Sequence, residues 1–206
     1  MTSNRRKGGR EALWPLLVLA VALAACTTVP EPSAPDVASW RAEKDRHMRE
    51  SPDSPVPEAQ RATFAPLPYY DIDPAYSVPA ALSVEPSEVV IELPTSTGQR
   101  RRMRRVGTLK FTLQGQPHTL AAFVDADTKD VRRLFVPFAD LTSGTETFAG
   151  GRYLDLDRTA TGIYELDFNR AYHPFCVFNT EYDCPYPPRE NRLPVPIRAG
   201  ERLPPS

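Results

Sequence analysis

The sequence predicts a mainly β domain of the α+β type, an antiparallel barrel or sandwich of short strands with an N-terminal helix packed on it. One observation is the proline content, 23 among 206 residues, against a usual share of about 5%. Proline fixes φ and lacks a backbone donor, so it disfavours long helices. The other is a series of seven or eight short strand-like segments separated by turns after Tyr76, which is typical of small barrels and sandwiches.

The N-terminal segment is typical of an export signal. Residues 1–25 begin with basic side chains and continue as an apolar run from Ala12 to Ala25. A basic start, a short apolar run and small residues at its end define a signal peptide. The run is shorter than the ~20 residues that cross a membrane. "LAAC", which ends at Cys26, resembles the lipobox of bacterial lipoproteins.

The lipobox resemblance implies cleavage before Cys26 and attachment of acyl chains such as palmitate to this residue. The membrane is therefore an expected partner, through a lipid anchor. Thr27 stands where an aspartate would favour retention in the inner membrane. We expect a cell-envelope location, on the periplasmic side of the outer membrane if the host is Gram-negative.

A tether and one helix follow the anchor. Residues 26–38 combine three prolines with small polar residues, which predicts an extended tether, and residues 39–206 then form a single β-rich domain. Asp36 is suited to cap a helix and Ser51-Pro52 to end it. One face of this helix carries residues that we expect to pack on the domain: Val37, Trp40, Lys44 and Met48. A short helical turn is expected after Pro57.

The predicted strands are residues 76–84, 88–96, 101–107, 132–140, 152–157 and 162–169, with a hairpin over 108–124. The hairpin follows from alternating apolar residues on either side of Gln114-Gly115-Gln116. The carboxylate pairs Asp125/Asp127 and Asp155/Asp157 have i, i+2 spacing, so each pair shares one face of a strand. Solvated strand ends are the simplest interpretation of both pairs.

Composition and motifs exclude several function classes. The net charge of −1 gives no reason to expect nucleic acid as a partner. The sequence lacks the phosphate-loop, dinucleotide, metalloprotease and serine-hydrolase motifs, and we expect no cofactor and no metal. Five arginines lie between positions 100 and 105. They suit either anionic head groups or an edge strand whose like charges discourage further pairing, and we favour the edge strand.

The loop "DLTSGTETFAGGRYLDL", residues 140–156, is the most suggestive segment for binding. Its glycines let the backbone approach a ligand closely, while Thr142, Thr145 and Thr147 supply hydroxyl groups and Arg152 a guanidinium. An ordered crossover whose arginine pairs with Asp167 or Asp140 explains the same residues equally well.

Together with "ELDFNRAYHPFCVFNTEYDCPYPPRENRL" and the closing "IRAGE", this loop resembles domain-of-unknown-function family 1684 over about Trp40 to Glu201. The resemblance implies one compact domain and carries no established reaction, so catalytic residues stay unassigned. His173 departs from the pattern, since asparagine is common there. Positions that are candidates for ligand binding are Thr142, Thr147, Arg152, Tyr153, Asp167, Asn169, Tyr172, Asn179, Asn191 and Arg192.

The segment 171–193 also holds Cys176 and Cys184. Zinc ligation with His173 and a redox pair are alternatives, but disulfides persist in exported proteins. We therefore predict a Cys176–Cys184 disulfide.

Three hypotheses for function stay open. The first is noncatalytic binding of a polar or anionic small molecule or envelope polymer. The second is an envelope hydrolase that uses carboxylates around Asp167 and Arg152. The third is a structural interaction module. A pocket with converging carboxylates would favour the enzyme, an Arg- and Tyr-lined groove the binder, and a flat apolar patch the interaction module.

Overall fold

The computed structural model describes residues 1–2, 34–129 and 132–204, and the fold lies within the unit Glu31–Ser206. Its strands form one antiparallel sheet in the order β5-β4-β3-β2-β1-β6. They are β1 (Ser77–Pro94), β2 (Arg100–Leu113), β3 (Gln116–Asp125), β4 (Arg133–Phe138), β5 (Arg152–Asp157) and β6 (Ile163–Asp167). The sheet curls into a nearly closed barrel, so the predicted fold class is confirmed. β5 and β6 are its two edges.

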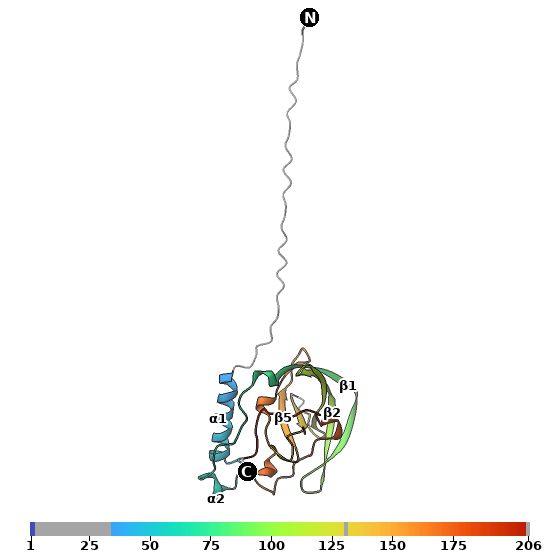
Figure 1. Cartoon of the computed structure of the whole chain (residues 1–206). Helices are drawn as coiled ribbons and strands as arrows, with labels where there is room; N and C mark the ends of the chain where they lie inside the picture. The colour runs from blue at the N-terminus through green and yellow to red at the C-terminus, as the bar shows by residue number, and fades with distance from the viewer. Residues whose placement is uncertain (3–33, 130–131, 205–206) are drawn as a thin grey trace. The chain divides into compact units, whose positions relative to one another are not determined.

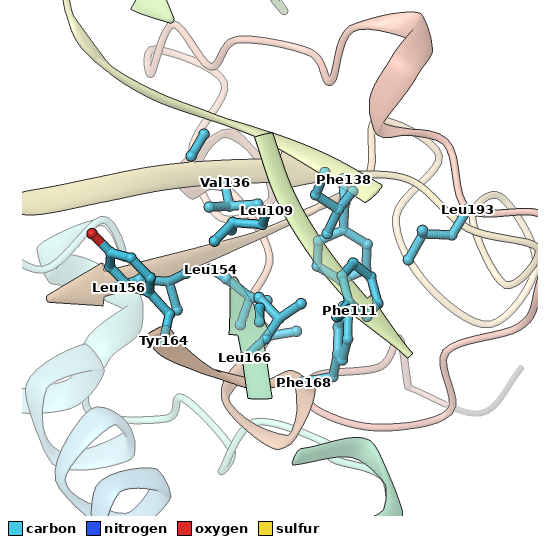
Figure 2. Packing of buried hydrophobic residues seen from close by; sticks show 14 of the residues in the cluster. Leu109, Phe111, Val136, Phe138, Leu154, Leu156, Tyr164, Leu166, Phe168 and Leu193 are labelled. Carbon is cyan, nitrogen blue, oxygen red and sulfur yellow. The ribbon is translucent and has the colours of Figure 1, made fainter. Parts of the chain in front are cut away.

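The barrel interior holds the main hydrophobic core, shown in Figure 2. Strand residues alternate between the two faces of a sheet, and on β2 this places Leu109, Phe111 and Leu113 inside. The Phe168 ring meets Phe138 edge-on, with centroids 5.3 Å apart. This contact packs the segment after β6 against the end of β4.

The strands are fewer and longer than predicted, because two pairs of predicted strands are continuous. Residues 76–84 and 88–96 belong to β1, and 101–107 joins the first arm of the hairpin in β2. The register shifts between Val84 and Val89 and between Arg105 and Gly107, so each apparent break is a bulge. A Cβ at Gly107 would lie 2.3 Å from the Ser83 carbonyl oxygen, so glycine permits the close approach of the two backbones there.

The predicted hairpin turn is present between β2 and β3. Gln114 and Gly115 have φ values of 51° and 75°. Two successive positive φ angles define the type I′ turn that matches the twist of paired strands.

The arginine-rich segment is not an edge strand, because β2 is hydrogen-bonded to both β1 and β3. That prediction was wrong. Its side chains are matched by carboxylates of neighbouring segments: Arg101 with Asp125 at 3.5 Å, Arg102 with Asp127 at 3.2 Å, and Arg105 with Glu190 at 3.4 Å. Ion pairs with carboxylates of β3 and of two nearby segments explain how so many like charges are accommodated on one strand.

Helix α1 (Ala34–Glu50) packs beside the sheet, and in Figure 1 the long strands β1 and β2 lie on the side away from it. It ends before Ser51-Pro52 as predicted. It begins earlier than Asp36, which lies in the first turn, where a carboxylate is favoured by the helix dipole. Residues 34–38 are therefore helical and not part of the predicted tether. Val37 and Met48 are buried, so the expected packing face is confirmed.

The remaining helices are short: α2 (Glu58–Arg61), η1 (Pro74–Tyr76), η2 (Phe168–Arg170), η3 (Phe175–Val177) and η4 (Arg189–Asn191). Within the described ranges, no helix combines the length and the apolar character needed to cross a membrane. The predicted signal peptide from residue 3 onward, Cys26 and the tether up to residue 33 lie outside the described residues.

Candidate functional site

The open seam between β5 and β6 holds a cavity of about 500 Å³, here called the seam pocket. Its base is formed by core residues of the two edge strands, Leu154, Leu156 and Tyr164. Asp155 and Asp157 alternate with these leucines on β5 and project from the other face of the strand. The pocket therefore exists because the barrel does not close, and edge-strand side chains form its walls.

Four carboxylates and two guanidinium groups line the seam pocket. The carboxylates are Asp155, Asp157, Glu165 and Asp167, and the guanidinium groups belong to Arg133 and Arg170. Arg133 pairs with Asp157 at 3.3 Å, and Arg170 lies 3.4 Å from Asp167. The pocket therefore carries more negative than positive side chains.

Asp155 and Glu165 have no arginine within ion-pair distance among the described residues. Asp155 accepts a hydrogen bond from the Tyr172 hydroxyl at 2.9 Å, and Glu165 accepts one from Ser77 at 2.9 Å. Loss of hydration raises the pKa of both carboxyl groups. Asp155 is accessible to solvent, but the concave wall around it displaces much of its water. These two carboxyl groups consequently hold protons more readily than ordinary surface acids.

Asp167 carries a buried carboxylate oxygen that accepts no hydrogen bond from the described residues. Its side chain is only 6% exposed, and Oδ1 accepts hydrogen bonds from the Asn169 backbone N–H and side-chain amide at 3.0 and 2.9 Å. Its Oδ2 accepts no hydrogen bond from any described residue, although Arg170 Nε lies 3.4 Å away. The charge of this buried oxygen is therefore balanced by the Arg170 guanidinium and not by a hydrogen bond.

Two aromatic side chains, Trp40 of α1 and Tyr172, also border the seam pocket. The Lys44 ammonium lies 4.3 Å from the Tyr172 ring centroid and 2.5 Å from buried Glu201. Burial lowers the lysine pKa, while the ion pair with Glu201 favours its charged form. Lys44 thus attaches α1 to the wall of the pocket.

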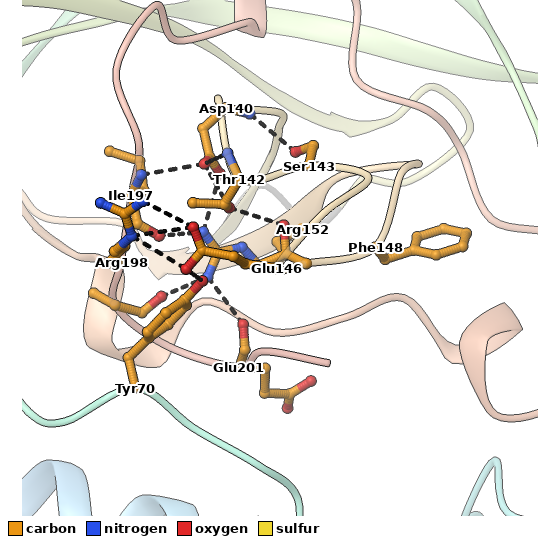
Figure 3. Close-up of polar contacts among 12 residues, drawn as sticks. Tyr70, Asp140, Thr142, Ser143, Glu146, Phe148, Arg152, Ile197, Arg198 and Glu201 are labelled. Atoms are coloured by element: carbon orange, nitrogen blue, oxygen red, sulfur yellow. Dashed lines mark hydrogen bonds and ion pairs between the residues drawn. The ribbon is translucent and has the colours of Figure 1, made fainter. Parts of the chain in front are cut away.

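The glycine-rich loop has a different role, because Arg152 points into the protein interior (Figure 3). Arg152 is fully buried and pairs with Asp140 at 3.0 Å. Its guanidinium also donates to backbone carbonyls of a C-terminal segment, residues 193–203, here called the strap: Ile197, Ala199 and Glu201, at 2.7, 2.5 and 3.0 Å. The expected pairing with Asp167 is wrong, and the alternative partner, Asp140, is the one observed.

Thr142 and Thr147 belong to the same buried network. The Thr142 hydroxyl donates to Asp140 at 2.6 Å and lies 2.9 Å from the Thr147 hydroxyl. Ile197 N–H also donates to Asp140, at 3.1 Å. These groups satisfy one another and line none of the cavities described.

The other candidate residues are spread over the domain. Asn191 is buried and bridges β3 and the end of β4, since its amide bonds both backbone groups of Ala121 and the Pro137 carbonyl. Asn169 is buried and bonds Asp73. Asn179 accepts from Glu181 N–H in a turn at 3.0 Å, and Arg192 is exposed. Tyr153 and Tyr172 lie next to each other, with ring centroids 5.7 Å apart.

Cys176 and Cys184 are free thiols, so the structure does not support the predicted disulfide. The Cys176 N–H donates to Cys184 Sγ at 3.2 Å. Burial raises the pKa of the Cys184 thiol to about 12, so it is neutral. His173 bonds Phe148 N–H and Glu201, away from both sulfur atoms. Among the described residues no cluster of three or more His, Cys, Asp or Glu side chains is placed to hold a metal ion.

Of the predicted candidates, the seam pocket collects Asp167 and Tyr172. It adds Trp40, Arg133, Glu165 and Arg170, none of which the sequence marked as site residues. The i, i+2 spacing of Asp155 and Asp157 was the available signal, because it placed two acids on one strand face. That Glu165 and Asp167 lie opposite depends on the curvature of the whole sheet.

Fold and site together define a small, barrel-like, mostly β domain with an acidic pocket between its edge strands. The family "Protein of unknown function (DUF1684)" matches residues 62–202, and the chain belongs to this family. The solution NMR structure of an uncharacterized protein from Haloarcula marismortui is similar, with 39% identity and a TM-score of 0.65. That match covers 82% of this chain and 93% of the other. No curated protein matches.

Proposed function

We propose that this chain is a cell-envelope lipoprotein, anchored through Cys26, whose domain binds a polar ligand noncatalytically in the seam pocket. The "LAAC" sequence supports the anchor. The observation that carries the binding role is the set of four carboxylates that line one cavity. Such a pocket selects a ligand that donates hydrogen bonds, so it favours hydroxyl and amine groups over the anionic ligand that the sequence also allowed.

The aromatic side chains that line the seam pocket narrow the ligand class further. Trp40 and Tyr172 line the pocket beside the carboxylates, and the Lys44 ammonium lies over one face of each ring. A sugar ring presents C–H groups on its faces and hydroxyl groups at its edge, and therefore matches both parts of this wall. An amino sugar adds a cation for Asp155 or Glu165. We therefore propose amino sugars, free or within an envelope polymer, as the ligand class.

A titration of the purified full-length protein in detergent tests this proposal, with glucosamine oligomers as the probe and calorimetry as the readout. Saturable binding is expected. Asp155→Asn and Glu165→Gln should each weaken it about tenfold, because a hydrogen bond to a charged group contributes ~1.5–3 kcal/mol. Asp127→Asn removes a charge outside the pocket and should bind like wild type. Absence of saturation, or equal affinity for all variants, would contradict the proposal.

A hydrolase is the second candidate, favoured by the raised pKa of Asp155 and Glu165 beside two arginine-paired carboxylates. Carboxyl groups in distinct environments can divide the roles of acid and base. Arg152 is not part of this hydrolase hypothesis, because its guanidinium is hydrogen-bonded to Asp140 and to the Ile197 carbonyl in the protein interior. Product formation from the same oligomers, lost in Asp155→Asn, would establish turnover and replace the binding role.

A further inference from the structure

A second cavity of about 300 Å³ lies on the outer face of the sheet, and Tyr172 separates it from the seam pocket. Strands and the cysteine segment supply its five aromatic side chains: Phe135, Tyr153, Tyr172, Phe175 and Tyr182. This cavity, here called the aromatic pocket, has a volume near the lower end of the usual range of about 300–1,000 Å³ for small-molecule sites. It suits one compact chemical group.

The rings of the aromatic pocket meet at nearly right angles. Phe135 and Tyr153 have centroids 4.7 Å apart at 73°, Tyr153 and Tyr172 are perpendicular at 5.7 Å, and Phe175 and Tyr182 lie 5.4 Å apart at 85°. A flat ring can stack on one orientation only. A rounded group, in contrast, contacts rings of both orientations at once, so the geometry selects a rounded ligand group.

Two of these rings are fixed by hydrogen bonds of their hydroxyl groups. Tyr153 donates to the Pro185 carbonyl at 2.6 Å, and Tyr172 donates to Asp155 at 2.9 Å. Because these hydroxyls are engaged, the two tyrosines present mainly ring surface to the pocket. Tyr172 already accepts the Lys44 ammonium at 4.3 Å from its centroid. The Tyr172 ring thus already makes a cation–π contact, with Lys44.

The charge at the border of the aromatic pocket favours a cation. Arg101 and Asp125, both lining residues, pair with each other at 3.5 Å. The remaining charged lining residue is Asp183, which accepts a hydrogen bond from the Thr97 hydroxyl at 2.5 Å. In the described part of the chain no cationic group lies within ion-pair distance of Asp183. The Asp183 carboxylate is therefore available to pair with a cationic ligand beside the aromatic rings.

We propose that the aromatic pocket is a second binding site, specific for a methylated ammonium group. Such a group is cationic and rounded, and its methyl surface matches aromatic rings, which attract cations through their negative faces. A quaternary ammonium donates no hydrogen bond, so it leaves no donor unsatisfied among the rings. The proposal does not depend on what the seam pocket binds.

The test compares three probes with the full-length protein in a detergent that lacks quaternary ammonium groups, by NMR or calorimetric titration. Choline should bind saturably. Its neutral isostere 3,3-dimethylbutan-1-ol has the same shape without the charge, and should bind at least about tenfold more weakly if ring faces and Asp183 act on the cation. Ethanolamine should also bind more weakly, because its ammonium remains well hydrated.

Variants assign the site. Tyr182→Leu removes one ring from the pocket, and Asp183→Asn removes the charge at its border while keeping the acceptor for Thr97. Each should reduce choline affinity severalfold. The control Glu43→Gln removes an exposed carboxylate of α1 that lines neither pocket and should leave choline affinity unchanged. Equal affinity for choline and its neutral isostere, or wild-type affinity in the Tyr182 and Asp183 variants, would overturn the proposal.

Discussion

Arg152 is the side chain with the most demanding surroundings in the domain. It is fully buried, and four acceptors surround it: one carboxylate and three backbone carbonyls of the strap. A buried charge is tolerated only when it is paired and hydrogen-bonded. Loss of the guanidinium would leave Asp140 as an uncompensated charge in the interior.

Arg152→Ala should therefore lower the free energy of unfolding by ~3–5 kcal/mol, the usual effect of breaking a buried ion pair from one side. Urea denaturation measures it. Arg133→Ala is the matched control, because its pair with Asp157 is exposed on both sides and such pairs contribute ~0–1 kcal/mol. Similar losses in the two variants would contradict the assignment of Arg152 to the core.

His173 gives stability a pH dependence of its own. Burial, with Arg152 and Lys44 nearby, lowers its pKa from the usual 6.5 to about 3. The unfolded chain then binds the proton more readily than the folded one, so stability falls as pH drops from about 6.5 towards about 3. Each unit of pH in this window corresponds to at most ~1.4 kcal/mol.

His173→Asn should remove this contribution, and denaturation midpoints between pH 7 and pH 4 would show a shallower decline than in wild type. His47 is exposed on α1, so His47→Asn should follow the wild-type curve. A wild-type slope in His173→Asn would show that other groups govern the acid sensitivity.

The elements show where sequence patterns suffice. The hairpin at Gln114-Gly115 and the end of α1 before Pro52 are local events, and both were predicted from a few neighbouring residues. Bulges are different. Gly107 was the last residue of a predicted strand, yet in the structure it lets β2 continue past the Ser83 carbonyl. Whether a strand lies at the edge of a sheet depends on segments far away in the sequence. The arginine-rich segment was therefore predicted wrongly as an edge strand.

Helix α1 depends on its packing face, since Met48 is fully buried with Val56 and Leu67. Met48→Ala should destabilise the domain by about 2–5 kcal/mol through lost burial and the cavity it leaves. Thermal or urea denaturation measures the change. Arg46→Ala, on the exposed face of the same helix, controls for helix propensity and should change stability by less than about 1 kcal/mol.

At the scale of the whole molecule, the seam pocket could be predicted only in part. The Asp155/Asp157 spacing and the candidates Asp167 and Tyr172 were visible in the sequence. These residues come together only because the two edge strands of the sheet, β5 and β6, face each other across the seam. No local sequence pattern encodes that curvature of the sheet. Candidates such as Arg152 and Asn191 belong instead to contacts that hold distant segments together.

The lipid anchor is tested on the intact chain. Cys26→Ser removes the thiol that acylation requires, so the protein should leave the membrane fraction or retain residues 1–25. Fractionation and intact-mass measurement detect both outcomes. Thr27→Ser, a neighbouring conservative change, should be processed and anchored like wild type. Unchanged mass and unchanged fractionation of Cys26→Ser would contradict the lipoprotein proposal.

The strap also bears on how the chain folds. Three of the hydrogen-bond acceptors of Arg152 are backbone carbonyls that lie 45 to 49 positions later in the sequence. A partly folded chain with its strands paired but no strap would hold a guanidinium in the interior with Asp140 as its main partner, an arrangement that burial penalises. Strand pairing and strap docking should therefore occur as one cooperative event. Because such contacts between distant segments slow folding, the edge strands β5 and β6 would stay exposed until that event is complete.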